Sequence, residues 1–153
     1  MLGLFVAIIV FNLLAFKLVK HITLNEMIHI WTFTIAFQVC FDVIIELKLK
    51  GYWYFYKNKV EYIGLLPHMI LVPPINVLFL NWYPFNKKLS KRMIYLGGWV
   101  IIILLYEMMT LLPRPWGYFH YGWWNFWYSI IIDPILLFIL LKFYKWISAL
   151  ERN

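Results

Sequence analysis

The chain has 153 residues, of which 64% are hydrophobic and 14% are charged, and its formal net charge at pH 7 is +7. Soluble domains contain about 45–50% apolar and ~25% charged residues, and a soluble protein this small has too much surface to hide so much apolar material. The composition therefore excludes a soluble globular domain, a disordered tail and a disulfide scaffold, and it predicts an integral membrane protein.

Five apolar segments follow one another, each close to the ~20 residues that a membrane-spanning helix needs. We predict helices, because an open sheet cannot satisfy its backbone groups in lipid and the runs do not alternate as barrel strands do. The first segment has no preceding basic residue and no cleavage site, which favours a retained helix over a signal peptide. The fold class is therefore all-α: a single transmembrane domain over 1–153, a bundle with spans at about 2–19, 27–47, 62–82, 93–112 and 123–141.

The basic residues lie in short hydrophilic gaps between the apolar runs, as expected of loop charges that orient a membrane protein. This placement excludes nucleic acid as a partner. With five spans, nine Lys and Arg fall on the side of the C-terminus and five on the other side. The bias predicts that the N-terminus lies outside and the C-terminus inside, although four lysines between the second and third spans weaken it.

Polar residues recur at helical spacing within two of the apolar segments. Thr34, Gln38, Asp42 and Glu46 stand four residues apart and would fall within a sector of about 120° of a helix. Asn125, Ser129 and Asp133 repeat this spacing within about 80°. Because polar groups facing lipid are costly, both stripes are expected to face the interior of the bundle.

Depth along each span places these groups at one end of the bundle. Asp42 and Glu46 lie late in the second span and Glu107 late in the fourth, whereas His68 lies early in the third. In an alternating bundle these ends face the same side, so we predict one polar pocket there, capped by the loop residues Arg114 and His120. The predicted members of the pocket are Thr34, Gln38, Asp42, Glu46, His68, Glu107, Asn125, Ser129 and Asp133.

Two interpretations of the pocket remain open. Polar side chains often only hold helices together, contributing about 0.6–2 kcal/mol each. Three carboxylates, Asp42, Glu107 and Asp133, without a Lys or Arg at their depth favour a functional site, since such groups carry protons or coordinate cations. No pair of histidines has metal-ligand spacing on a helix, and no nucleotide loop or nucleophile motif occurs, so we expect no metal and no cofactor.

The third segment contains Pro73 and Pro74 near its middle, which predicts a kink or break that frees backbone carbonyls. This break would be a static aid to packing, a hinge or a carbonyl ligand site. Aromatic clusters at residues 51–56 and 115–124 are typical of an interfacial belt, and a rim that binds a lipid or isoprenoid is the alternative.

Three short stretches carry a family resemblance: Asn81-Trp82-Tyr83-Pro84, Tyr106-Glu107, and the run from Gly117-Tyr118 to Trp123-Trp124. With the length and the five-span layout, they resemble a family of small uncharacterised multi-pass membrane proteins of endospore-forming Firmicutes. The resemblance covers roughly residues 27–145 and implies a bacterial plasma or spore membrane. It implies no activity, so it assigns no catalytic residue.

Three hypotheses for function follow from these patterns. The pocket would bind or move a proton, a cation or a small polar solute. Alternatively, the chain is a membrane-embedded enzyme that acts on a lipid or isoprenoid, with a carboxylate as general acid. A third hypothesis is a structural subunit, in a homo-oligomer or beside another membrane protein, whose polar stripes a partner satisfies.

Overall fold

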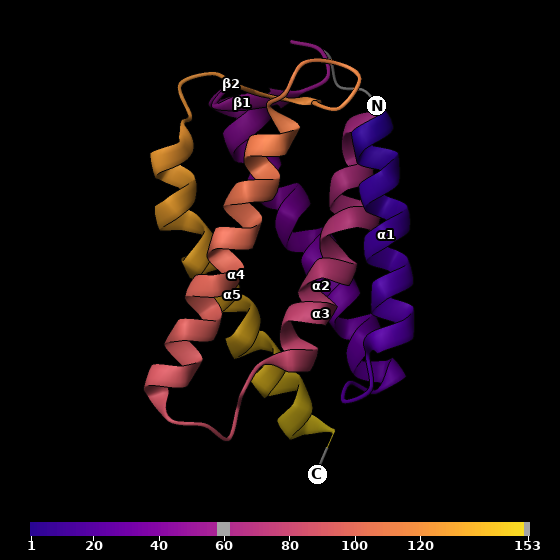
Figure 1. Cartoon of the computed structure of the whole chain (residues 1–153), viewed down its shortest axis with the longest axis vertical. Coiled ribbons are helices and arrows are strands. Elements are labelled where there is room, and N and C mark those ends of the chain that lie inside the picture. The colour runs from indigo at the N-terminus through magenta and orange to yellow at the C-terminus, as the bar shows by residue number, and fades with distance from the viewer. Residues whose placement is uncertain (58–61, 152–153) are drawn as a thin grey trace.

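A computed structural model describes residues 1–57 and 62–151 and shows five helices running alternately in opposite directions (Figure 1). The prediction of an all-α chain is confirmed. Two basic residues counted for the orientation, Lys59 and Arg152, lie outside the described residues. The N-terminus lies at the upper end of the bundle in Figure 1 and the C-terminus at the lower end.

The first two helices run in opposite directions (Figure 1). Helix α1 covers Leu2–Leu18 and α2 covers Leu24–Asp42, which continues directly into a π-helical turn, η1, over Val43–Lys48. Helix α2 begins earlier than predicted because Thr23 caps it: its hydroxyl accepts a hydrogen bond from the Glu26 backbone N–H at 3.1 Å, and the Glu26 carboxylate accepts from the Thr23 N–H at 2.9 Å.

The third pass is assembled from three helical pieces. A 3-10 turn, η2 (Tyr62–Leu65), is followed by a π-helical turn, η3 (Pro67–Leu71), and by α3 (Val72–Trp82). The π geometry therefore stands immediately before Pro73 and Pro74, where the sequence predicted a distortion. Helix α3 is the most buried element, with Val77, Leu78 and Phe79 at 0–2% exposure.

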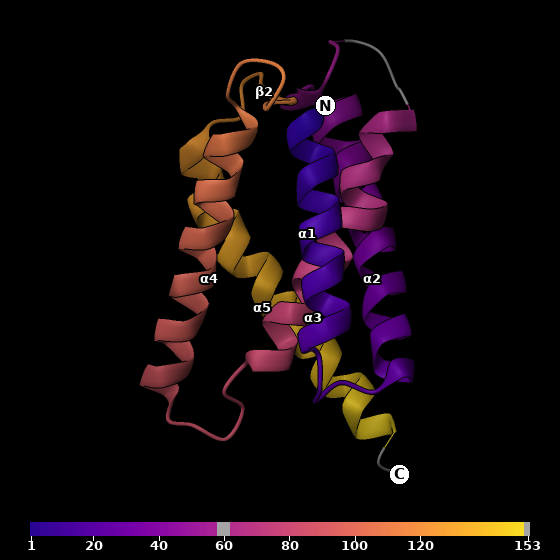
Figure 2. The same ribbon diagram turned by 45° about the vertical axis from the view of Figure 1, so that its right-hand side comes forward.

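Helices α4 (Leu89–Thr110) and α5 (Phe126–Leu150) complete the bundle. Both extend beyond the predicted spans at their lower ends, because the prediction followed apolar residues alone, whereas helical geometry continues through the basic residues there. At their upper ends both are two or three residues shorter than predicted. Helix α5 packs against α4, α2 and α3, and α1 packs against α3 and η3 (Figure 2). The aromatic rings of Phe79, Tyr95 and Trp99 join α3 to α4 in the core.

A two-stranded antiparallel ribbon, which the sequence analysis did not predict, closes the upper end of the bundle (Figure 1). Strand β1 (Tyr52–Tyr54) pairs with β2 (Phe119–Tyr121), with Trp53 opposite His120. The ribbon joins the two loops that the sequence analysis treated as separate aromatic clusters.

Within the described residues, four helical passes are long and apolar enough to cross a membrane. They are Leu24–Lys48, Tyr62–Trp82, Leu89–Thr110 and Phe126–Leu150, and α1 is a shorter apolar helix of 17 residues. Large apolar side chains cover the outside of the bundle: Ile94 is 74% exposed, Ile101 59% and Phe138 54%.

The carbonyls freed by the proline pair receive donors from neighbouring helices. A proline removes the N–H that would bond the carbonyl four residues earlier, which here leaves those of Met69 and Ile70. The Trp31 indole N–H donates to Met69 O at 3.1 Å, and the Asn12 side chain donates to Ile70 O at 3.0 Å. The proline site is therefore tied to α1 and α2, which favours a static distortion that aids packing.

We expect Asn12→Leu to lower the free energy of unfolding by about 0.5–1.5 kcal/mol, because the hydrogen bond from the Asn12 side chain to the Ile70 carbonyl would be lost. Unfolding in mild detergent, followed by circular dichroism, measures this loss. Leu13→Ala is the control, because Leu13 is 55% exposed on the same helix. An equal or smaller effect of Asn12→Leu would contradict the assigned role of Asn12.

Candidate functional site

A cavity of about 260 Å³ lies inside the bundle, and residues of all five helical passes and of both ribbon strands line it. Its lining includes seven of the nine predicted pocket residues. Asn76 and Thr110 add further polar groups, and the Asn76 side chain donates to the Thr34 hydroxyl at 3.0 Å. The seven are Thr34, Gln38, Asp42, His68, Glu107, Ser129 and Asp133.

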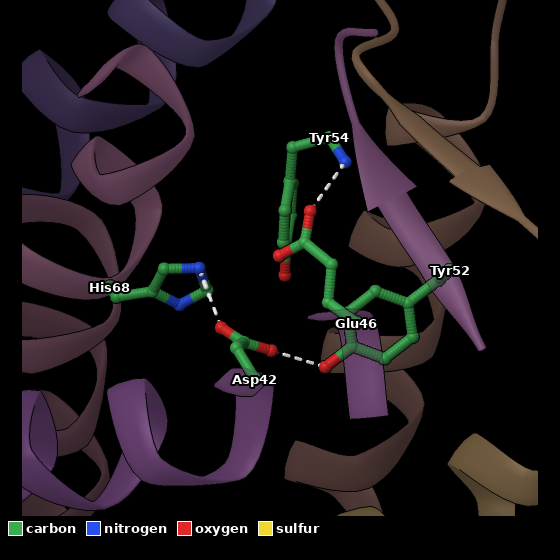
Figure 3. Close-up of polar contacts among 5 residues, drawn as sticks. All are labelled: Asp42, Glu46, Tyr52, Tyr54 and His68. Carbon is green, nitrogen blue, oxygen red and sulfur yellow. Dashed lines mark hydrogen bonds and ion pairs between the residues drawn. The ribbon is translucent and has the colours of Figure 1, made fainter. Parts of the chain in front are cut away.

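One acidic cluster lies where α2, η3 and β1 meet (Figure 3). His68 Nε2 is 2.7 Å from Asp42 Oδ2, and the Tyr52 hydroxyl donates to Asp42 Oδ1. Asp42 is 7% exposed and His68 4%. Buried carboxylates need such partners, because transfer of an unpaired charge out of water is strongly unfavourable.

Two π-helical turns position this cluster. Asp42 is the last residue of α2, immediately before η1, and His68 lies within η3. The i→i+5 bonding of a π turn is wider than that of an α-helix, and such turns occur frequently at functional sites. Here they bring the carboxylate and the imidazole, which lie on different passes, into contact.

A second acidic cluster lies across the cavity on α4 and α5. Glu107 Oε1 accepts hydrogen bonds from the Ser129 hydroxyl at 2.8 Å and from the Tyr121 hydroxyl. The Trp124 indole N–H donates to the Ser129 oxygen at 3.0 Å. Asp133 lies one turn beyond Ser129, and its Oδ2 is buried without a hydrogen-bond partner among the described residues.

The ribbon forms the aromatic ceiling of the cavity. Side chains alternate along a strand, so Tyr52, Tyr54 and Phe119 face the cavity whereas Trp53 and His120 face away from it. Burial, reinforced by the Asp42 carboxylate, raises the pKa of Tyr52 well above its usual range. The phenol therefore stays protonated and serves Asp42 as a donor at any physiological pH.

The lower part of the cavity carries no charge and is mainly apolar, apart from the hydrogen-bonded side chains of Thr34 and Asn76. Its walls come from α2, α4 and α5 and include Phe33, Trp99, Ile103, Leu136 and Leu140. The Phe33 ring stacks on Phe143 with ring centroids 4.0 Å apart, which closes the side between α2 and α5. The cavity thus has a polar, acidic end beneath the ribbon and an apolar end towards the middle of the bundle.

Four predicted residues do not line the cavity. Glu46 lies beyond Asp42 in η1, where the wider turn moves it off the stripe, and its carboxylate accepts from the Tyr54 backbone N–H at 3.4 Å. Asn125 is the exposed N-cap of α5 and accepts from the Trp127 N–H at 3.0 Å. Two further side chains form contacts in the outer loops: Arg114 lies 4.9 Å above the Tyr56 ring, and His120 stacks on Trp53.

The cavity residues that sequence reasoning missed are mainly aromatic. Tyr52, Tyr54, Tyr118 and Trp124 belong to clusters assigned to an interfacial belt or a lipid-binding rim, yet each lines the cavity. The runs Tyr52-Trp53-Tyr54 and Phe119-His120-Tyr121 contain aromatic residues of the kind that strands favour, but three residues are too short a run to predict a strand.

The lining carries negative charge with little positive compensation. Asp42, Glu107 and Asp133 line the cavity beside one histidine, and none of the described residues that line it is Lys or Arg. The described residues contain no group of three or more His, Cys, Asp or Glu side chains that could hold a metal ion. No family model, curated protein or solved structure matches the chain.

Proposed function

We propose that the chain is an integral membrane protein of five spans whose cavity binds a small cation. Four passes have the length and hydropathy of membrane spans, and α1 supplies a shorter fifth. The exposed apolar side chains around the bundle support this placement, because an apolar surface of that extent is stable against lipid and not against water.

The charge of the cavity lining is the observation that carries the proposal. Three carboxylates from α2, α4 and α5 face one cavity, and His68 is the one side chain among the described lining residues that could offset their charge. Like charges gathered in a place of low dielectric are costly, and a bound cation removes that cost. An anion would meet the same carboxylates and is therefore excluded as a ligand.

Methylammonium is a suitable probe, and its binding to the full chain in lipid nanodiscs is measured by isothermal titration calorimetry. We expect Asp133→Asn to weaken binding at least about tenfold, since charges ~4 Å apart interact by about 4 kcal/mol at an effective dielectric of 20 and desolvation offsets part of this. Asn is nearly isosteric, and the Asp133 Oδ2 atom has no hydrogen bond to lose among the described residues.

Glu151→Gln is the matched control, because it removes one negative charge at the opposite end of the bundle. Glu151 lies at the end of α5, where its carboxylate accepts from the Asn25 side chain at 2.5 Å. Unchanged affinity in Asp133→Asn, or equal losses in the two variants, would refute the proposed cation site.

We also propose that the ribbon end faces outwards and the basic end faces the cytoplasm. Lys87, Lys88, Lys91 and Arg92 lie in the loop after α3 and the start of α4, at the lower end of Figure 1, and cytoplasmic loops carry such an excess. The family resemblance supports a bacterial plasma or spore membrane. A reporter fused to the C-terminus that is active only in the cytoplasm should be active, and silence would reverse the orientation.

A further inference from the structure

The apolar half of the cavity narrows the class of cation that it would accept. Resting on the cation site proposed above, we infer that the ligand is a lipophilic ammonium ion, with a short hydrocarbon chain, that reaches the cavity from the bilayer between α1 and α4. The charge of the upper end, the lining of the lower end and the packing around the cavity each support one part of this inference.

The upper end offers two kinds of group that recognise an ammonium ion. Carboxylates on opposite walls, Asp42 and Glu107, supply charge, and the rings of Tyr52, Tyr54 and Trp124 stand beside them. Cations are attracted to aromatic faces, and cages of aromatic rings are used to bind alkylated ammonium groups. An inorganic ion would instead require a shell of oxygen ligands, and the described residues hold no acidic cluster of that kind.

The lower end fits a hydrocarbon chain. Trp99 and Ile103 on α4 face Leu136 and Leu140 on α5 across it, and none of these side chains offers a charge. A fully hydrated cation gains nothing from such a wall, whereas each buried methylene contributes through the hydrophobic effect. A volume of about 260 Å³ lies below the ~300–1,000 Å³ range of sites for drug-sized ligands, so the chain inside it is short.

The cavity reaches the outer surface of the bundle on the side of α4 that faces α1. Ile102 lines the cavity and is also 50% exposed. It lies one helical turn before Tyr106, whose ring meets Phe11 of α1 edge to face with centroids 6.2 Å apart. Residues four apart share a helix face, so the Ile102 stripe faces α1.

The other sides of the cavity are closed by packing. Helix α4 packs against α5, and α2 packs against α5 and α3, whereas α1 packs against α3 and η3 and forms no comparable contact with α4 within the described residues. The Ile102 side chain lies eight residues before the end of α4, or ~12 Å along the axis at about 1.5 Å per residue, which places this opening at hydrocarbon depth.

Hexylammonium, methylammonium and 1-hexanol separate the two parts of the ligand. They are titrated against the full chain in nanodiscs of a zwitterionic lipid, with the heats from protein-free nanodiscs subtracted. Hexylammonium should bind at least about thirtyfold more tightly than methylammonium, because each added methylene that leaves water contributes about threefold to fourfold. It should also bind at least about tenfold more tightly than 1-hexanol, which has the same chain without the charge.

A pair of neighbouring variants tests the route from the bilayer. Ile102→Phe enlarges the side chain at the proposed opening, and Ile101→Phe makes the same change at a site that is 59% exposed and does not line the cavity. Stopped-flow measurement of intrinsic tryptophan fluorescence follows hexylammonium binding, because two of the nine tryptophans, Trp99 and Trp124, line the cavity. Ile102→Phe should slow both association and dissociation about tenfold and keep Kd within about threefold, as expected of a gate rather than a contact.

The outcomes separate this inference from the cation site itself. Equal affinity for hexylammonium and methylammonium would overturn the lipophilic ligand and leave the cation site standing. Equal affinity for hexylammonium and 1-hexanol would overturn the ammonium group, and binding of none of the three would overturn both proposals. Unchanged rates in Ile102→Phe, or the same slowing in Ile101→Phe, would overturn the route between α1 and α4.

Discussion

Glu107→Gln should weaken cation binding at least about thirtyfold while the protein remains folded. The glutamine side-chain oxygen can still accept hydrogen bonds from Tyr121 and Ser129, which both donate to Glu107 Oε1. Only the negative charge is lost, and we expect the affinity for methylammonium to fall at least about thirtyfold, or ~2 kcal/mol, a fraction of the interaction between close charges. Calorimetry in nanodiscs measures the affinity, and circular dichroism in the same discs verifies the fold.

Glu107→Leu separates charge from structure at the same position. It removes the acceptor as well, leaving two hydroxyl donors unsatisfied in a partly buried place, at a cost of about 1–3 kcal/mol each. The leucine variant should therefore unfold at a lower detergent concentration than the glutamine variant. Equal stability of the two variants would contradict the hydrogen-bond network, and retained binding in Glu107→Gln would contradict the cation site.

Gly122→Ala should open the ribbon and disorder the ceiling of the cavity. A Cβ atom at Gly122 would lie 2.5 Å from the Lys50 carbonyl oxygen and 2.8 Å from the Gly51 carbonyl oxygen. The same strand end donates from the Gly122 and Trp124 backbone N–H groups to the Gly51 carbonyl, at 2.7 and 2.9 Å. Because real Cβ atoms do not approach backbone this closely, these bonds must lengthen or break.

The expected result is a loss of about 2–4 kcal/mol of unfolding free energy, from two weakened hydrogen bonds and backbone strain. Proteolysis between β1 and α3 should also become faster. Gly97→Ala is the control, because a Cβ at Gly97 meets nothing within 4 Å, and alanine is the better helix former. If Gly122→Ala were as stable as Gly97→Ala, the close approach of the two ribbon strands would be refuted.

The helical stripes were the part of the site that the sequence could predict. A polar residue at every fourth position specifies a helix face, so the sequence alone places Asp42, Ser129 and Asp133 on helix faces that point into the bundle. The prediction failed at the ends of the stripes, Glu46 and Asn125. A π-helical turn and an N-cap interrupt the helical period at these two residues, and neither follows from hydropathy.

The same reasoning from residue spacing could not predict the ribbon. Each strand has only three residues, and its partner lies beyond two further helical passes. Alternation over so short a run resembles the amphipathic aromatic residues of a membrane interface. The direction of the Tyr52 side chain, into a cavity or towards lipid headgroups, depends on a tertiary contact with Phe119. The centroids of the two rings lie 5.0 Å apart.

The pairing of β1 with β2 also constrains the order of assembly during synthesis. Strand β1 leaves the ribosome long before β2, which follows α4. The backbone N–H and C=O groups of β1 therefore need water as a hydrogen-bond partner until β2 pairs with them. The hydrogen bond from the Tyr52 hydroxyl to Asp42 also forms late, because pairing of β1 with β2 holds Tyr52 beside the Asp42 and His68 pair. In the membrane orientation proposed above, the site is complete only after the α4–α5 loop has been translocated.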